Sequence, residues 1–304
     1  MNIMERVINE ASMALDLTAA GFCADPARVA YTWRDAALYA LAVGAGPNEL
    51  DLLLERPGFK VLPGFLTSLA FNASGPLLRR VGGIEDRAMF GEHSVKLADS
   101  ARLLPGGSLT LHGRVQAIYA LGALGIADLQ FAMHDDSGNK VAKVSFQVYY
   151  DGEAPPNAPR PPRGARVLTP NRAPDWRIAL ATRPEQALLY RLCGDLNPLH
   201  ADPATAARLP LLTNGRPILH GLCTAGFVGR AVIAGCCASD SDRLLGLEGR
   251  FSRPVWPGDT LVVEGWGADA SCLRVRTLER PEDDVLTAAR AWIQIPGLRS
   301  LDAR

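Results

Sequence analysis

Residues 38–49 read LYALAVGAGPNE and residues 189–200 read LYRLCGDLNPLH, so both stretches place Leu, Tyr, Leu and Pro at the same relative positions. Two further pairs match in the same order along the chain: VLPGFLTSLAF (61–71) with ILHGLCTAGFV (218–228), and LLPGGSLTL (103–111) with VWPGDTLVV (255–263). The offsets are 151, 157 and 152 residues, so only small insertions separate the two series. We infer that the 304-residue chain contains two copies of one domain, each large enough to hold its own core.

A segment rich in proline and arginine, GEAPPNAPRPPRGARVLTPNRAP at 152–174, divides the chain almost in half. Proline fixes φ and removes a backbone donor, so we expect an extended connector there. The expected organisation is a first repeat over 1–151, a linker over 152–174 and a second repeat over 175–304.

Each repeat places its helices before its strands. Apolar residues at helical spacing predict helices, and runs bounded by Gly and Pro predict strands. The predicted helices are 34–43 and 65–72 in the first repeat and 182–194 and 219–234 in the second, with Thr182 as an N-cap. The predicted strands are 91–97, 108–119, 124–134 and 139–149, followed by 244–251, 260–266, 272–278 and 288–294. Helices segregated from a run of antiparallel strands indicate an α+β fold.

Composition excludes several classes of protein. The 32 basic and 32 acidic residues cancel, so no basic excess favours a nucleic-acid or membrane partner. The sequence contains no uninterrupted apolar run of about 18 residues, as a membrane span needs, and the start, MNIMERVINEASMALDL, does not resemble a signal peptide. Six cysteines without a CxxC pair favour reduced thiols over a disulfide framework. We expect a cytoplasmic protein.

The two copies differ in their polar residues, and the difference points to one site. Residues of the second copy with useful chemistry fall on other residue types in the first: Asp195 on Gly44, Asn197 on Gly46, His200 on Glu49 and His220 on Pro63. A duplication of this kind suggests that chemistry lies in the second copy, while the first copy is retained for binding.

Asp195 and His200 are five residues apart with Pro198 between them, and a turn of that kind brings a carboxylate and an imidazole to one small space. An apolar pocket raises the pKa of a carboxyl toward that of histidine. Such a pair suits proton transfer to or from a bound water, with Asn197 orienting either partner. The alternative is that Asp195 and Asn197 cap local backbone and His200 is an ordinary packed histidine.

The stretch RPILHGLCTAG opens an apolar helix. Free N–H groups at a helix start bind anions and oxyanions, and Gly221 lets a ligand approach the backbone closely. Gly221 is also compatible with packing alone, since Gly64 stands at its position in the first copy. His220 is expected to support the site, and Arg216 is a candidate for a substrate phosphate.

A metal centre is a weaker interpretation. Cys193, Asp195, His200 and His220 are all ligand types for zinc, but HExxH and paired CxxC spacings are missing from the sequence. We therefore predict no metal. Cys193 lies inside the apolar helical pattern, so a packed thiol is favoured over a nucleophile.

The segments YRLCGDLNPLHADP and RPILHGLCTAGF closely resemble the signature of the R-specific (type-2) enoyl-CoA hydratases of the MaoC-like family. RDAALYALAVGAGPNEL and VWPGDTLVVEGW are similar to the half-domains of its double hotdog form. The resemblance implies an α+β double hotdog, two tandem repeats that each wrap an antiparallel sheet around a central helix. It also implies an acyl-CoA partner and reversible addition of water to a trans-2-enoyl-CoA, giving the (R)-3-hydroxyacyl-CoA without metal or redox cofactor.

Carried over by position, Asp195 and His200 hold one water at C3 and return a proton to C2, Asn197 orients them, and the Gly221 N–H binds the thioester carbonyl. The first repeat then houses the acyl chain. An unusually long loop between His200 and His220 keeps a specialised branched, dicarboxylic or sterol-derived acyl thioester open as the substrate. A hotdog thioesterase and a non-catalytic acyl-CoA-binding module are further alternatives. Either a monomer or a homodimer of the double unit is compatible with the sequence, and LDAR at 301–304 differs from an SKL-type peroxisomal address.

Overall fold

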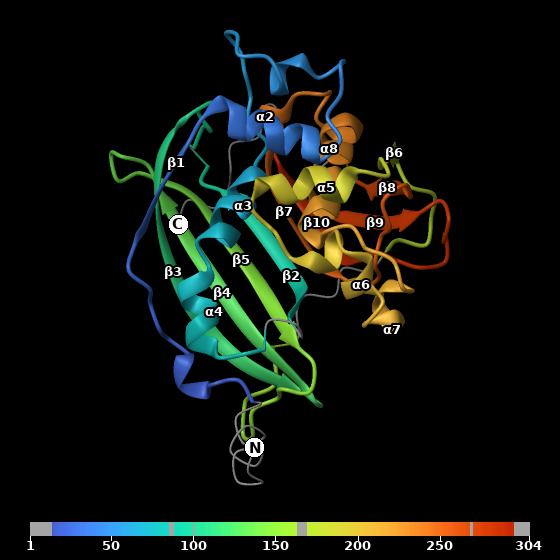
Figure 1. Ribbon diagram of the computed structural model, residues 1–304. Helices are drawn as coiled ribbons and strands as arrows, with labels where there is room; N and C mark the ends of the chain where they lie inside the picture. The colour runs from blue at the N-terminus through green and yellow to red at the C-terminus, as the bar shows by residue number, and fades with distance from the viewer. Residues whose placement is uncertain (1–13, 85–87, 100, 163–168, 268–269, 295–304) are drawn as a thin grey trace.

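Ten strands form one antiparallel sheet in the order β1-β3-β4-β5-β2-β7-β10-β9-β8-β6 (Figure 1). The computed structural model describes residues 14–84, 88–99, 101–162, 169–267 and 270–294. The strands of the first half are β1 (Ala27–Tyr31), β2 (Ala88–Leu97), β3 (Gly107–Leu121), β4 (Leu124–His134) and β5 (Lys140–Tyr150). Those of the second half are β6 (Trp176–Ala181), β7 (Leu244–Phe251), β8 (Thr260–Trp266), β9 (Cys272–Thr277) and β10 (Leu286–Ile293).

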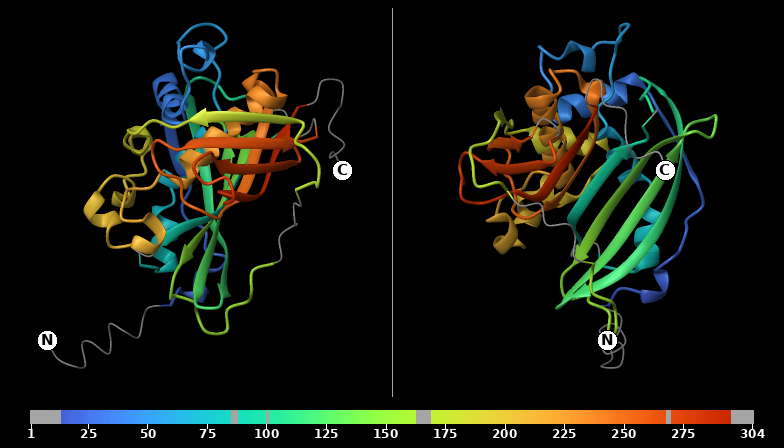
Figure 2. Two further views of the ribbon diagram at one scale, coloured as in Figure 1. Left: turned by 90° about the vertical axis from the view of Figure 1, so that its right-hand side faces the viewer. Right: turned by 180° about the vertical axis from the view of Figure 1, so that it is seen from behind.

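The strand order reproduces the duplication. The first half runs β1-β3-β4-β5-β2 and the second runs β6-β8-β9-β10-β7 from its outer edge inward, which is the same order with each number raised by five. The halves join where β2 pairs with β7, from Glu92 opposite Arg250 to Lys96 opposite Gly246. This is the double hotdog that the sequence predicts, with its two sheets continuous through one pair of strands (Figure 2).

Each half packs helices against its sheet. In the second half the 16-residue α8 (Gly221–Cys236) lies against β6, β7 and β8. In the first half the corresponding helix is broken into α3 (Phe65–Asn72), against β5, and α4 (Gly75–Val81), against β3. The other helices are α2 (Trp33–Ala42), α5 (Gln186–Tyr190), α6 (Pro203–Ala206) and α7 (Pro210–Thr213). Short 3-10 turns cover 17–19, 50–52, 191–193, 198–200 and 241–243.

One hydrophobic core runs through both halves, because the helices meet above the β2–β7 junction. The buried rings of Tyr39 on α2 and Tyr190 on α5 lie 6.2 Å apart, edge to face. Polar contacts add to this contact between the repeats: the Gln186 side-chain amide donates to the Ala42 carbonyl at 2.6 Å, and Arg230 on α8 forms an ion pair with Glu49.

The predicted strands all occur, with shifts of at most three residues at their ends. The edge strands β1 and β6 and the helices α4, α6 and α7 were not predicted from the sequence. The predicted helix over 182–194 is wrong in part: α5 begins at Gln186 after the cap residue Glu185. The predicted N-cap Thr182 instead donates its hydroxyl to the Asp259 carbonyl, because the chain is still leaving β6 at that point. Among the described residues, no helix combines the length and the apolar character that crossing a membrane needs.

The junction predicts a position that tolerates no side chain. A Cβ on Gly246 would collide with the Val95 carbonyl oxygen of the paired strand. We expect Gly246→Ala to lower the free energy of unfolding by about 1–3 kcal/mol, as overpacking of a rigid site does, measured by urea denaturation. Gly46→Ala is the matched control, because the space around a Cβ there is open and the change should be nearly neutral. Equal stability of the two variants would contradict this view of the junction.

Candidate active site

The loop that carries Asp195 is set by a left-handed glycine. The 3-10 turn Arg191–Cys193 ends at Gly194, whose φ is +117°. A Cβ at Gly194 would also collide with the side chain of Asn72, which donates to the Cys193 carbonyl at 3.0 Å. Glycine is therefore required here for both backbone conformation and space. The loop then turns inward and buries Asp195, which is 5% exposed.

Asn197 shapes the turn between the two predicted catalytic residues. Its side-chain oxygen accepts the Leu199 N–H at 2.9 Å and caps the short helix Pro198–His200. Its own N–H donates to the Asp195 carboxylate at 3.2 Å. Asn197 thus fixes the backbone that presents His200 and contacts Asp195 through its main chain.

His200 is held in one tautomer. Its Nδ1 lies 2.9 Å from the Ile218 carbonyl oxygen, which only accepts, so Nδ1 carries the hydrogen and Nε2 offers a lone pair. Burial lowers the pKa of His200 to about 4, and the bond to Ile218 offsets this only in part. At neutral pH the ring is therefore an uncharged acceptor.

Asp195 is shifted in the opposite direction. Burial raises the pKa of its carboxyl to about 6, and the Asn197 N–H lowers it by a smaller amount. A ligand atom from each of Asp195, His200 and His220 lies within 4.8 Å of the others. The structure thus brings the predicted pair together, with a third group beside it.

His220 connects this pair to α8. Its Nε2 donates to the Asp195 main-chain carbonyl at 3.2 Å, and its ring stacks on His200 with centroids 3.8 Å apart. Tyr190 packs on its other side at 4.9 Å. Burial, together with the adjacent His200, holds the pKa of His220 well below its usual value. His220 is also the N-cap residue of α8, so it joins the start of this helix to the cluster, and its supporting role stays a prediction.

Gly221 is the first residue of α8, where N–H groups have no partner within the helix. The Phe251 ring lies 3.3 Å from the position that a Cβ on Gly221 would take. The N–H groups at the start of α8 therefore lie beside Phe251, at the positive end of the helix dipole. Sequence reasoning missed Phe251, since its contact with Gly221 exists only once β7 passes under α8.

Arg216 lies outside this cluster. It is exposed, and its guanidinium stacks over the Trp256 ring at 5.5 Å, next to Arg280 at 4.4 Å from the same ring. It is two residues before Ile218, the partner of His200. Its expected contact with a substrate phosphate stays a prediction.

Cys193 is not placed for nucleophilic chemistry. Burial raises the pKa of its thiol to about 12, so the thiolate is scarce at neutral pH. Asp195, His200 and His220 do bring three possible metal ligands together, and the expectation of no metal stays a prediction.

Comparison with known proteins identifies relatives of both halves. Residues 29–152 match the MFE-2 hydratase 2 N-terminal domain and residues 166–283 match the MaoC like domain. The chain is 36% identical to enoyl-CoA hydratase ChsH3 of Mycobacterium tuberculosis, over 84% of this chain and 90% of that protein. It is 32% identical to the peroxisomal enoyl-CoA hydratase 2 of Arabidopsis thaliana, over 90% and 93%. A MaoC-like dehydratase from Phytophthora capsici superposes with a TM-score of 0.79 at 26% identity, over 92% and 98%.

The raised pKa of Asp195 predicts that its charge destabilises the folded protein. The folded state binds this proton more tightly than the unfolded chain does, so stability falls as pH rises from about 4 to about 6, and the penalty is complete above that range. We expect Asp195→Asn to raise the free energy of unfolding by about 1–3 kcal/mol at pH 7.5, and the gain to vanish below pH 4.

Urea denaturation at several pH values measures this gain. Asp202→Asn is the control, because hydrogen bonds from Thr205 and Ala204 lower the pKa of that exposed carboxyl and its replacement should bring no gain. A pH-independent effect of Asp195→Asn would argue against a buried charge at this position.

Proposed function

The chain belongs to the MaoC-like enoyl-CoA hydratase family, and from this premise we propose that it catalyses reversible hydration of a trans-2-enoyl-CoA to the (R)-3-hydroxyacyl-CoA. One observation carries the proposal: a buried carboxylate and a neutral imidazole face one space beside the free N-terminus of α8. The pair supplies proton transfer and the helix start supplies oxyanion stabilisation.

The two pKa shifts determine which of Asp195 and His200 carries a proton. Near pH 7 Asp195 is mostly carboxylate and His200 Nε2 carries a lone pair, so the two groups can hold both O–H bonds of one water. We assign the proton transfer to Asp195, because a pKa of about 6 lies closer to neutrality than one of about 4. His200 then orients the water.

Hydration adds one water across the C2–C3 double bond in two steps. The water oxygen bonds to C3 while its proton passes to Asp195, and the C2–C3 π electrons move toward the thioester oxygen. The Gly221 N–H donates to that oxygen, and the N-terminus of α8 stabilises its negative charge. Asp195 then returns the proton to C2 on the same face, so one water has been added and the enzyme is unchanged.

The reverse reaction uses the same groups, so dehydration of a 3-hydroxyacyl thioester is part of the proposal. The M. tuberculosis relative named 3-hydroxyacyl-thioester dehydratase Y, 34% identical over 92% of its length, is consistent with this. A thioesterase would need a different use of the water, and a non-catalytic acyl-CoA-binding module would give no reason for the buried ionised Asp195.

We also propose a cytoplasmic location without a nucleic-acid partner. The cysteines, all of which lie in the described part of the chain, form no disulfide, which suits a reducing compartment. The acyl-CoA is the substrate, and the proposed chemistry uses protein groups alone. A homodimer, which the sequence allows alongside a monomer, stays a possible partner arrangement to be tested.

The proposal predicts loss of hydration when either member of the pair is removed. Asp195→Ala and His200→Ala should each lower kcat/KM by about 100- to 10,000-fold, the usual contribution of a positioned acid or base. The decrease in enoyl absorbance of crotonyl-CoA measures the rate, and the sign of the product's optical rotation tests the (R) configuration. Cys193→Ala is the control, since Cys193 lies outside the cluster; near-normal activity in either pair variant would refute the assignment.

Arg216 predicts a separate effect on binding. If its guanidinium contacts a phosphate of CoA, Arg216→Ala should raise KM for crotonyl-CoA severalfold with little change in kcat. The same variant should act like the unsubstituted protein on the crotonyl thioester of N-acetylcysteamine, which lacks phosphates. Equal effects on both substrates would show that Arg216 acts on the fold of the loop instead.

A further inference from the structure

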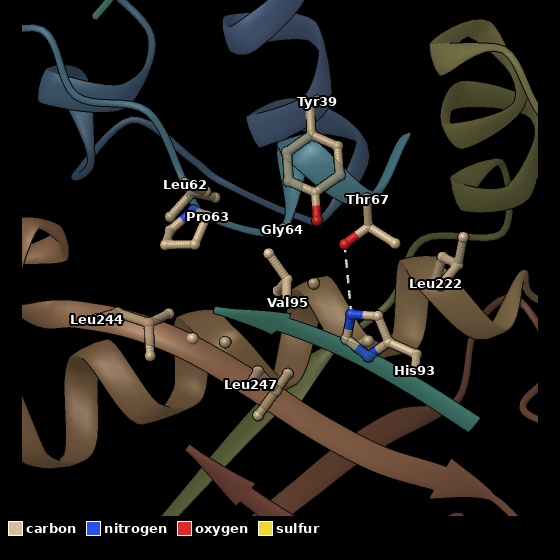
Figure 3. A pocket seen from close by; sticks show the side chains of 14 residues that line it. Tyr39, Leu62, Pro63, Gly64, Thr67, His93, Val95, Leu222, Leu244 and Leu247 are labelled. Carbon is tan, nitrogen blue, oxygen red and sulfur yellow. Dashed lines mark hydrogen bonds between the residues drawn. The ribbon is translucent and has the colours of Figure 1, made fainter. Parts of the chain in front are cut away.

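A narrow cavity lies between the two halves, against the first turns of α8 (Figure 3). One wall is the face of α8 formed by Leu222, Ala225, Gly226 and Gly229, which share one side of the helix over about 10 Å. Gly64 and Thr67 at the start of α3 form the opposite wall, and β2 and β7 form the floor. Leu222 follows Gly221 directly, so this wall begins one residue beyond the proposed carbonyl site.

Most of this lining is apolar; the polar side chains are those of Tyr39, Thr67 and, on β2, His93. His93 is 4% exposed, and its Nε2 lies 3.4 Å from the Thr67 hydroxyl. Its Nδ1 is buried without a hydrogen-bond partner among the described residues. An unsatisfied buried polar atom is unfavourable by about 1–3 kcal/mol, so its presence in a cavity wall requires an explanation.

Phe251 lies between His93 and the proposed carbonyl site at Gly221. The Phe251 ring adjoins Gly221 on one side and stacks on His93 on the other, with centroids 6.3 Å apart. His93 and Thr67 therefore lie one aromatic ring away from the carbonyl site proposed at Gly221. The proposed hydration uses neither residue, which leaves this polar pair available to the rest of the chain.

We propose that His93 and Thr67 form a specificity site for an uncharged oxygen substituent, a hydroxyl or keto group, on the acyl chain beyond the enoyl unit. This inference rests on the proposed function and defines its substrate class. Both partners adapt to a donor or an acceptor, because a neutral imidazole and a hydroxyl each offer both roles.

The charge state of the cavity argues against a dicarboxylic acyl chain. Burial lowers the pKa of His93 to about 4, so the ring is neutral at physiological pH. The residues that line the cavity include none with a permanent charge. An ionised carboxylate would thus be buried without a counter-ion, which is strongly unfavourable.

The test compares acyl-CoAs of equal length. A trans-2-enoyl-CoA with an unsubstituted tail is set against a series that carries one hydroxyl or keto group at successive tail carbons, and kcat/KM is measured for each. We expect the protein to prefer an oxygen at one or two adjacent carbons over the unsubstituted tail. His93→Phe keeps an aromatic ring and removes both nitrogens, and it should reduce this preference about three- to tenfold, as loss of one buried hydrogen bond does.

Thr67→Val removes the hydroxyl at nearly constant volume and should reduce the same preference. It keeps the inference testable if His93→Phe fails to fold. His112→Leu is the control, because His112 is exposed on β3 and should leave the preference intact. The inference is overturned if no substituted tail is preferred, or if the preference persists in both His93→Phe and Thr67→Val.

Crotonyl-CoA separates this inference from the proposed function. If the protein hydrates crotonyl-CoA but shows no preference for tail oxygens, the specificity site is wrong and the hydratase stands. If crotonyl-CoA and every longer enoyl-CoA are inert, the hydratase itself is wrong. Affinity for saturated acyl-CoAs with and without the tail oxygen, measured by calorimetry, gives a readout of the site that does not depend on turnover.

Discussion

The pairing of β2 with β7 is the constraint on which the rest of the structure depends. It makes two five-stranded sheets into one and brings the helices of both halves together above the junction. The backbones approach so closely there that Gly246 leaves no room for a Cβ. Because α3 and α8 start on opposite sides of this junction, the cavity beside the second half is roofed by the first. Neither repeat alone would enclose it.

The duplication has two outcomes at one structural position. In the second half the turn after α5 carries Asp195 and His200 into a buried cluster. In the first half the counterpart of His200 is Glu49, which pairs with Arg230 and so ties the two halves together. The Tyr39 hydroxyl fills the space beside Gly64, the counterpart of Gly221. In the first repeat, packing and contacts between the halves thus occupy the positions that in the second repeat are left open for an oxyanion.

Sequence reasoning succeeded where information is local or repeated. Runs bounded by Gly and Pro located β7 and β8 to the residue, and the spacing around Pro198 placed Asp195 and His200 in one turn. Sequence reasoning missed β1 and β6, which are short edge strands of five and six residues whose pairing is long-range. The predicted start of α5 was too early, because the Thr182 hydroxyl donates to the Asp259 carbonyl instead of capping the helix. The role inferred for His93 could not be predicted from the sequence, because it depends on Thr67 and Phe251, which only the fold brings beside it.

The proposed catalytic cluster of Asp195, His200 and His220 and the start of α8 differ in charge. At neutral pH the cluster contains one carboxylate and two uncharged imidazoles, because burial opposes the protonation of His200 and His220 and each would repel a charge on the other. Such a cluster accepts protons and would repel an oxyanion. The negative charge that develops on the substrate must therefore lie elsewhere, at the positive N-terminus of α8. The bond from His220 Nε2 to the Asp195 carbonyl fixes the distance between these two regions, since Gly221 is the next residue. A single buried histidine can in this way set the geometry of the reaction without transferring a proton.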